Sequence, residues 1–456
     1  MKIKIVIILT LFTTFFLIGN ISLKDPYRTI LKDKFSQIIK KISSWDRHNQ
    51  RFFVDQIFSF NEPFIAYSKQ LIYDYKEDVE IFFAGETSVN LIIEQFDISG
   101  NVIFTDSLVI DSPTKIKPLY SSLNGYIGKT SKYIFSPKIK NGWIQILVEP
   151  IFGKRVYIPV FIQSREDSDI IFVESTDTFN AYISSYKLPT HYQRRLSPLG
   201  AFTKPKSSPQ SYKIITPKDS IKISCHESLI NADNIWKKMF VKNEINFKTV
   251  SDIYLDNYEN FKSSKVLIFG AHNEYWTYEK AKNVLKFAKN GGNVVFLGGN
   301  TAWRAVERHE NFDILYGDDL RDNGFGEVIN ELLGSYYDMN GYDTYAPFKI
   351  IYPKELEKII AFDNGIKIFA EGTNFDHCKE IIHGGSGHET DKLIPSANKE
   401  FILIAKGLNR SKGGASIVFR DFLNGGSILN FGSVSLWHNA NDQIIKKLIL
   451  SRLNNL

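Results

Sequence analysis

The hydrophobic positions along the chain follow three successive patterns. Lys2 and Lys4 precede an uncharged, mostly apolar run that lasts until Lys24. From Val79 to about residue 165, apolar and polar residues alternate, which is the period of half-buried strands. From Asp169 onward, short continuous apolar runs alternate with stripes at helical spacing. This third pattern is typical of a buried parallel sheet covered by helices.

The first pattern predicts a membrane segment at residues 1–23. A membrane-spanning helix needs about 20 apolar residues, and residues 5–23 carry no charge. The run ends without the small-residue cleavage site of a signal peptide. We therefore expect a single-pass N-terminal anchor with the body of the protein outside the cytoplasm. The alternative is a secreted or periplasmic protein after signal cleavage. Residues 24–64 are expected to form a linker with one helix.

The other two patterns predict two domains. Period-two runs such as residues 79–83, 89–93 and 143–148 predict a β-sandwich over residues 65–165. Residues 168–456 are expected to form an α/β domain with a parallel, doubly wound sheet. Within it, Thr277 is expected to cap a helix. Residues 183–225 and 304–395 show little periodicity, apart from one helix in the second stretch.

Polar and aromatic residues follow four of the predicted strands at their carboxyl ends. In open α/β sheets, ligands bind just beyond these ends, so the four edges together predict a pocket. The residues that they supply are Tyr182, His272, Glu274, Tyr275, Asn300, Trp303, Ser433 and Trp437.

His272 and Glu274 are the strongest candidates for chemistry. In extended backbone, residues two apart point the same way, so the pair can ligate a metal or orient each other. The structural alternative is that Glu274 favours the positive end of the helix that follows it. The glycine-rich residues 383–389 contain two histidines and a glutamate. They are either a second metal patch or a surface loop.

Covalent catalysis is disfavoured by the sequence. The turn at residues 271–276 has no cysteine, and Gly-x-Ser-x-Gly is absent. Metal-assisted hydrolysis is therefore the better enzyme hypothesis.

Composition removes other classes of protein. The 456 residues are 43% hydrophobic and 23% charged, which are ordinary globular values. Lys and Arg exceed Asp and Glu by only 56 to 50, too small an excess to indicate a nucleic-acid partner. The two cysteines, Cys225 and Cys378, allow one disulfide but no disulfide scaffold.

The motifs resemble the large (beta) subunit of N,N-dimethylformamidase and its relatives. The similarity covers about residues 140–450, in the same order as in the family. The matching stretches are Ala181-Tyr182, Gly270-Ala271-His272-Asn273-Glu274-Tyr275-Trp276-Thr277, Gly291-Gly292 through Gly298-Gly299-Asn300, Trp303, Gly385-Ser386-Gly387 with Asp391, and Gly425-Gly426 through Gly432-Ser433 to Trp437.

This resemblance implies a class I glutamine amidotransferase-like α/β domain that holds one iron ion through two tyrosines and a glutamate. By resemblance, Tyr182 and Glu274 are metal ligands, and His272 is the histidine two residues before the glutamate. Trp143 stands near the place expected for the second tyrosine, after Asn141-Gly142. Because an indole cannot ligate iron as a phenolate can, we expect iron to be bound weakly or lost.

Two functions remain open from the sequence. The first is a membrane-tethered hydrolase of the C–N bond in a small amide, with His272 and Glu274 as catalytic residues. The second is a non-catalytic ligand-binding or envelope-assembly protein that keeps the fold and has a degraded metal site.

Overall fold

The computed structural model describes residues 64–182, 201–205 and 229–453, apart from short gaps within these ranges. The predicted membrane segment, nearly all of the predicted linker and both cysteines lie outside the described residues. None of the helices in the described ranges is long and apolar enough to span a bilayer.

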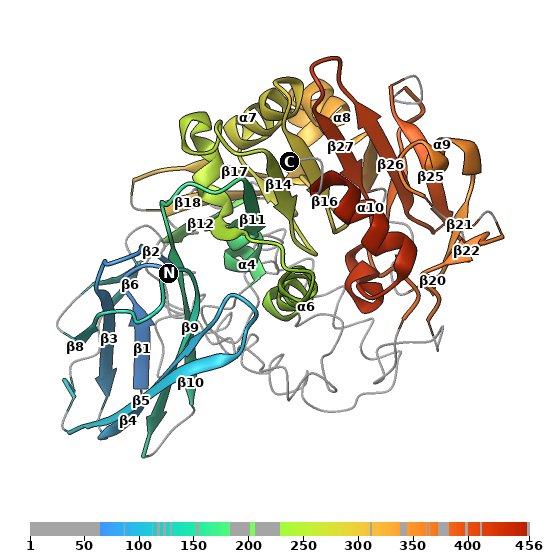
Figure 1. Ribbon diagram of the computed structural model, residues 1–456. Helices are drawn as coiled ribbons and strands as arrows, with labels where there is room; N and C mark the ends of the chain where they lie inside the picture. Colours follow the sequence, from blue (N-terminus) through green and yellow to red (C-terminus); the bar gives the residue numbers. More distant parts are fainter. Residues whose placement is uncertain are drawn as a thin grey trace, which may run out of the picture.

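Two sheets, almost wholly antiparallel, form the amino-terminal part of the described chain (Figure 1). Alternating burial along β3 and β4 places their apolar residues in a shared core between the sheets. The smaller sheet has the order β1-β3-β8, with β1 (Phe64–Ser68), β3 (Val79–Gly85) and β8 (Ser131–Phe135). The larger sheet has the order β2-β10-β9-β4-β5, with β2 (Ile72–Asp74), β4 (Val89–Phe96), β5 (Val102–Ile110), β9 (Gly142–Pro150) and β10 (Val156–Gln163).

Gly142 opens β9 in a conformation that requires glycine. Its φ is +119°, and a Cβ there would lie 3.2 Å from the carbonyl oxygen of Phe96. The turn therefore fixes where Trp143 enters the sheet.

A nine-stranded sheet forms the centre of the second part, in the order β13-β11-β14-β16-β27-β26-β25-β21-β22. The first five strands are parallel: β13 (Lys248–Ser251), β11 (Ile170–Glu174), β14 (Val266–Phe269), β16 (Asn293–Phe296) and β27 (Ser427–Asn430). The other four extend the sheet antiparallel: β26 (Ser416–Asp421), β25 (Ile402–Gly407), β21 (Phe348–Ile350) and β22 (Ile368–Phe369). A mixed α/β fold is thus confirmed. The sequence predicted the parallel part of this sheet but not its antiparallel half.

Helices cover both faces of this sheet. Helices α6 (Leu229–Lys242) and α10 (Gln443–Leu453) pack on one face, and α7 (Tyr278–Lys289) and α8 (Gly326–Leu333) on the other. As predicted, the Thr277 side chain caps α7 by accepting a hydrogen bond from the backbone N–H of Lys280. The near-continuous apolar strands are explained by this burial on both faces.

Residues 304–395 are richer in strands than the sequence indicated. β17 (Arg304–Arg308) and β18 (Phe312–Asp319) join β12 (Ala201–Pro205) and β15 (Tyr275–Trp276) in a four-stranded sheet. Two short pairs follow, β19 (Ser335–Tyr337) with β24 (Asp391–Leu393), and β20 (Tyr345–Ala346) with β23 (Ser386–Gly387). Strand β17 was missed because arginines, not apolar residues, occupy its two ends.

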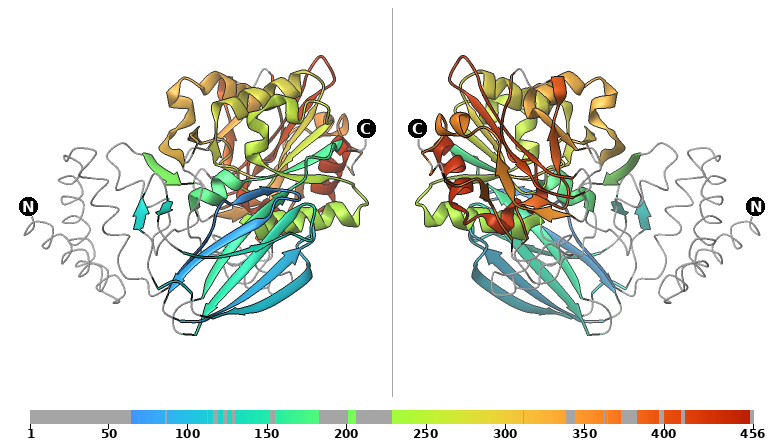
Figure 2. Two further views of the ribbon diagram at one scale, coloured as in Figure 1. Left: turned by 90° about the vertical axis from the view of Figure 1, so that its left-hand side faces the viewer. Right: turned by 90° about the vertical axis from the view of Figure 1, so that its right-hand side faces the viewer.

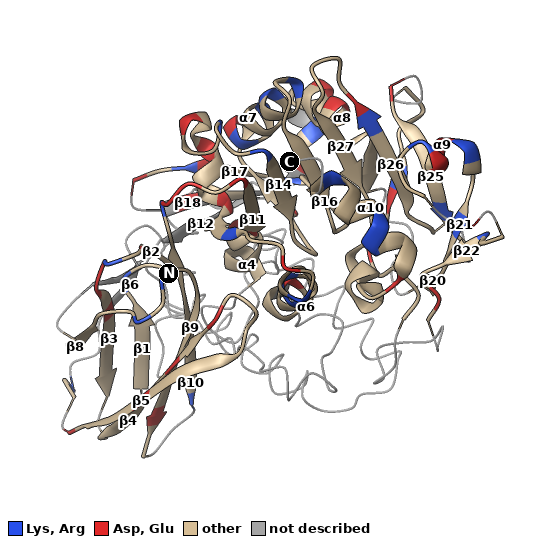
Figure 3. Cartoon of the chain, viewed as in Figure 1, with Lys and Arg blue, Asp and Glu red and all other residues tan. Residues whose placement is uncertain are grey.

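The two parts of the molecule meet through an apolar cluster. It joins Trp143 and Phe161 of the antiparallel sheets to Phe179 and Ile230 of the α/β part. Both side views show the antiparallel sheets packed beneath the α/β part (Figure 2). Basic and acidic positions are interspersed along the described chain (Figure 3), as the near balance of charges predicts.

Candidate active site

Tyr182 and Glu274 meet at the carboxyl edge of the parallel strands. Tyr182 is the last residue of α4 (Thr176–Tyr182), the short helix that follows β11. Glu274 lies in the loop after β14 and is fully buried. The Tyr182 hydroxyl donates a hydrogen bond to Glu274 Oε2 at 2.5 Å. The structure therefore brings together the two side chains proposed as metal ligands.

His272 lies between two carboxylates. Its Nε2 is 3.1 Å from Glu389 Oε2 and 3.9 Å from Glu274 Oε2. Burial lowers the pKa of His272, but the hydrogen bond and charge of Glu389, with the charge of Glu274, leave that pKa raised. Burial raises the pKa of Glu389, yet the hydrogen bond and charge of His272, together with His388 and Asn300, outweigh burial and leave that pKa at about 2. Both shifts favour an imidazolium paired with a carboxylate over a neutral pair.

Arg304 holds the other oxygen of Glu274. Its Nε donates to Glu274 Oε1 at 3.3 Å, and its backbone N–H donates to the Glu274 carbonyl at 2.8 Å. The guanidinium lies 3.3 Å over the ring of Trp303. Burial raises the pKa of Glu274 although the charges of His272 and Arg304 oppose it. Burial and the charge of Glu274 raise the pKa of the Tyr182 phenol well above its usual value.

Two glycines let the surrounding loops approach closely. A Cβ at Gly298 would lie 2.1 Å from the Ala271 carbonyl oxygen, and a Cβ at Gly299 would lie 2.6 Å from the Glu389 carbonyl oxygen. His272 and Gly299 form a backbone bridge. Only residues without a side chain fit here, and this packing carries the Asn300 loop to His272.

Asn300 connects the loops through its side chain and its backbone. Its Nδ2 donates to Glu389 Oε2 at 3.0 Å and lies 3.5 Å from His272 Nε2. Its backbone N–H donates to Asp391 Oδ1 at 2.8 Å. The backbone is left-handed, with a φ of +52°, a region in which asparagine is enriched among non-glycine residues.

The remaining predicted residues lie around this centre in different roles. Tyr275 is buried, with its ring 6.4 Å from that of Tyr182. Ser433 Oγ donates to the Gly385 carbonyl at 2.7 Å and so holds the neighbouring loop. Trp437 stacks on His438 at 3.7 Å and belongs to the core under α10.

Trp143 lies in an apolar environment rather than at the carboxylates. Its ring is 5.1 Å from both Phe161 and Phe179 and is 3% exposed. Phe179 is on α4, three residues before Tyr182, so Trp143 packs one helical turn below the phenol.

Sequence reasoning assigned three residues of this site, Arg304, Glu389 and Asp391, no role in it. Glu389 was considered only as part of a second patch, because nothing in the spacing joins residues 383–389 to His272. The bridge between Thr390 and Ser433 carries that segment back to the carboxyl edge of the sheet. The available signals were the acidic residue in this glycine-rich segment and the family resemblance at Asp391.

The oxygen atoms at this site suit a metal ion that takes only a few of its ligands from the protein. Among the described residues, no group of three His, Cys, Asp or Glu side chains has the geometry of a metal site. A phenol oxygen and a carboxylate oxygen do converge at Tyr182 and Glu274. Hard oxygen donors of this kind suit a ferric ion, and Arg304 occupies the other carboxylate oxygen.

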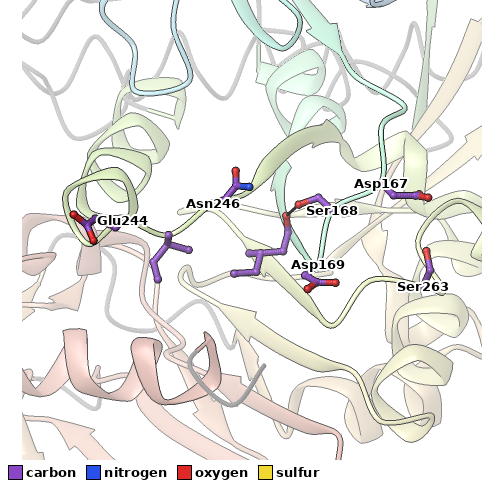
Figure 4. Close-up of a pocket in the computed structure, with 8 residues that line it drawn as sticks. Asp167, Ser168, Asp169, Glu244, Asn246 and Ser263 are labelled. Atoms are coloured by element: carbon purple, nitrogen blue, oxygen red, sulfur yellow. Dashed lines mark hydrogen bonds between the residues drawn. The ribbon is translucent and has the colours of Figure 1, made fainter.

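A separate cavity of about 570 Å³ lies at the opposite edge of the sheet (Figure 4). Its lining includes Asp167, Asp169, Glu244 and Asn246, which come just before the amino ends of strands or at the end of α6. None of the residues described above lines it, so we do not assign the chemistry to this cavity.

Asp391 predicts a pH-dependent stability. Burial raises its pKa to about 7, against about 3.9 in an unfolded chain. Between these values the native state binds more protons than the unfolded state, so stability falls as pH rises. The contribution reaches about 1.4 kcal/mol per pH unit between about pH 5 and pH 6. Asp391→Asn keeps an oxygen for the Asn300 N–H and should remove this slope.

Urea unfolding of both proteins at pH 5, 6 and 8 measures that difference. The contributions of the other titrating groups to the pH dependence of stability cancel in this comparison. An identical pH dependence in the two proteins would show that Asp391 does not titrate in this range.

Comparison with known proteins gives one family match. Residues 137–318 match the family model described as N,N-dimethylformamidase beta subunit-like, C-terminal. This part of the chain is similar to that family. The match confirms the resemblance over β9 to β18, which includes Tyr182, His272, Glu274 and Asn300. Glu389 and Asp391 lie beyond the matched residues.

Other likenesses are slight. The DNA primase small subunit PriS of Methanococcus maripaludis is 23% identical over 184 residues, which are 36% of this chain and 51% of that protein. The chain therefore spans about half the length of this curated relative.

The likenesses to solved structures are also slight. A ThuA-like protein of Bacteroides uniformis superposes with a TM-score of 0.33 and 11% identity, covering 62% of this chain and 88% of its own. The mmIFT52 N-terminal domain superposes with a TM-score of 0.29 and 11% identity, covering 48% and 85%.

Proposed function

We propose that this protein hydrolyses the C–N bond of a small amide. The observation that carries the proposal is the convergence of four side chains: the Tyr182 phenol on Glu274, and His272 between Glu274 and Glu389. The match of residues 137–318 to the N,N-dimethylformamidase beta subunit-like family supports the same reaction class. The uncharged amino-terminal run supports a tether that keeps the site outside the cytoplasm.

The His272–Glu389 pair supplies the proton transfers. An imidazolium beside Glu389 can give its proton to the leaving nitrogen, and the imidazole left behind can take a proton from water. Glu389 keeps the ring in one orientation and stabilises its charged form. Burial strengthens both effects, because little water screens the charges.

Tyr182 and Glu274 are the residues that would hold a metal ion. A bound ion would polarise the amide carbonyl and lower the pKa of water. Arg304 and the Tyr182 hydroxyl fix the two oxygens of Glu274, so the carboxylate is oriented before a substrate arrives.

The binding-protein alternative also has an observation in its favour. Arg304 already pairs with Glu274, and Trp143 lies among apolar rings. If Arg304 has replaced a metal ion as the partner of Glu274, the site keeps its pocket but lacks the metal that hydrolysis would need.

Tyr182→Phe tests the proposed function. We expect amide hydrolysis, followed as amine release from small amides, to fall about 100-fold or more, because the hydroxyl that orients Glu274 is lost. Tyr73→Phe is the matched control, since Tyr73 is a buried tyrosine whose hydroxyl is hydrogen-bonded far away, in the antiparallel sheets. Equal activity of both variants would contradict the assigned role of Tyr182.

Trp143→Tyr tests the degraded metal site. We expect the wild-type protein to hold iron weakly, and the variant to hold more iron and to show a visible tyrosinate-to-iron absorption band. Phe161→Tyr is the control, because it adds a phenol to the same cluster away from the predicted ligand position. Elemental analysis and absorbance decide the matter. Iron content unchanged by Trp143→Tyr would show that residue 143 is no ligand position.

A further inference from the structure

Strand β5 is a free sheet edge that carries apolar side chains in solvent. It is the last strand of the five-stranded sheet and pairs only with β4 among the strands that the structure describes. Its first six residues are exposed. Four of its apolar residues are more than a third exposed, namely Val102, Ile103, Phe104 and Val109. A long apolar edge of this kind is a template for pairing with another strand.

The sequence of β5 reads similarly in both directions from Asp106, its central residue. Asp106 is also the only charged residue of the strand, which contains neither glycine nor proline. Residues at equal distances on the two sides of Asp106 are alike in chemistry. The pairs are Thr105 with Ser107, Phe104 with Leu108, Ile103 with Val109, and Val102 with Ile110.

This likeness is what an antiparallel pairing of β5 with a second β5 requires. In a two-fold symmetric interface the same surface serves both copies and must be complementary to itself. With the axis at Asp106, Phe104 of one copy lies opposite Leu108 of the other, and Thr105 opposite Ser107. Opposite residues share one face of a sheet, so apolar side chains meet apolar ones and hydroxyls meet hydroxyls. An unrelated strand would match this order only by chance, which favours a second copy as the partner.

Two features limit the strength of the pairing. The register of β5 against β4 shifts between Gln95 and Phe96, so the regular part of β5 starts at Phe104. The ladder between two copies is therefore regular only over Phe104–Leu108. In addition, the two Asp106 carboxylates lie opposite each other at the axis, and like charges in that position are destabilising.

The contact area also indicates weak association. A strand of nine residues is about 30 Å long, and a sheet is about 10 Å thick, so each copy buries roughly 300 Å² of its edge. The total of roughly 600 Å² is below the ~1,200 Å² at which specific, stable interfaces begin. The dimer should therefore dissociate on dilution. A shared membrane tether would raise the local concentration of the copies.

We infer that the protein forms a two-fold symmetric dimer in which β5 pairs antiparallel with β5 of a second copy. The two five-stranded sheets then continue into each other across the axis. This inference is independent of the proposed function, since β5 lies in the antiparallel part and the residues of the candidate active site lie in the α/β part.

Sedimentation of the full-length protein in a nonionic detergent, across a wide range of concentrations, tests the dimer. Phe104→Glu should raise the dissociation constant at least about 10-fold, because symmetry places the new charge in the interface twice. Ile368→Glu is the matched control and should associate as the wild type does. Ile368 is 42% exposed on β22, the edge strand of the nine-stranded sheet.

Asp106→Asn tests the position of the axis. Asp106 Oδ1 accepts the backbone N–H of Ser107 at 2.9 Å, and asparagine keeps an oxygen for this hydrogen bond while removing the charge. The variant should therefore associate about 3-fold more tightly than the wild type, because the like-charge pair is gone.

Asp106→Cys tests the same geometry without relying on affinity. Opposite residues of an antiparallel pair have Cα atoms about 4.5–5.5 Å apart, which is within the range that a disulfide spans. Mild oxidation should join two copies through residue 106, and mass spectrometry distinguishes this bond from any bond of Cys225 or Cys378. Ile368→Cys is the control and should not crosslink at a comparable rate.

Three results would overturn the inference. The first is a monomer at every concentration in both the wild type and Asp106→Asn. The second is a dimer that Phe104→Glu weakens no more than Ile368→Glu does, which would place the contact elsewhere in the chain. The third is crosslinking of Asp106→Cys no faster than of Ile368→Cys. None of these measurements involves amide hydrolysis, so failure of the dimer and failure of the proposed function are separate outcomes.

Discussion

Replacing Glu274 with glutamine is expected to reduce amide hydrolysis about 100- to 1,000-fold. Glutamine keeps the shape but loses the charge that accepts from the Tyr182 hydroxyl and pairs with Arg304. Loss of a single preorganised electrostatic group in an active site typically has an effect of this size. The variant should also lose any bound iron.

Stability should change as well, because Arg304 would lose its carboxylate partner while staying buried. Breaking a buried ion pair costs about 3–5 kcal/mol. Glu174→Gln is the matched control, since Glu174 pairs with Lys237 in a similarly buried setting, at 2.6 Å. It should be destabilised comparably and, at a temperature where it is folded, retain activity. Equal losses of activity in both variants would mean that Glu274 acts only through stability.

Asp177→Asn is expected to lower the free energy of unfolding by about 3–5 kcal/mol. Asp177 lies in the first turn of α4 and accepts hydrogen bonds from Lys280 at 2.8 Å and from Arg308 at 2.7 and 2.6 Å. Lys280 is fully buried. Burial raises the pKa of Asp177, but the charges of Arg308 and Lys280 outweigh it and leave the pKa lowered. Its contribution is therefore present above about pH 4, the unfolded value, and is lost as pH falls.

The same variant should weaken the site, because β17 fixes both segments that carry the proposed metal ligands. Arg308 binds α4, which ends at Tyr182, and Arg304 on the same strand binds Glu274. Chemical unfolding at pH 7 measures the loss. Asp169→Asn is the control, since the exposed pair of Asp169 with Lys265 should contribute no more than about 1 kcal/mol. A loss for Asp177→Asn no larger than the control's would show that the buried network contributes little.

The part of the site that sequence reasoning found follows from one physical rule. Parallel strands end at a common edge, so residues after β11, β14 and β16 must be neighbours. Tyr182, His272, Glu274 and Asn300 all follow such strands. In the structure Tyr182 binds Glu274, and His272 lies next to both Glu274 and Asn300. The helix of Tyr182 was not predicted, because it is a short one that periodicity does not resolve.

The rest of the site depends on strand pairings that the hydrophobic periodicity of the sequence does not reveal. Glu389 and Asp391 reach the site through two-residue and three-residue strands, which are too short to leave a pattern. Arg304 was unrecognised because a charged residue usually indicates a solvent-exposed position, whereas here it is buried against Glu274. Two of the four antiparallel strands of the large sheet, β21 and β22, were missed for a related reason, because they are equally short.

Isotope incorporation from water tests the central claim most directly. The purified full-length protein is incubated with acetamide in ¹⁸O-labelled water, and acetate and ammonia are measured together. The account predicts equal amounts of the two products, one labelled oxygen in each newly formed acetate, and no product above background with Glu274→Gln. Binding of acetamide by the folded wild-type protein without release of ammonia would contradict it and identify a binding protein.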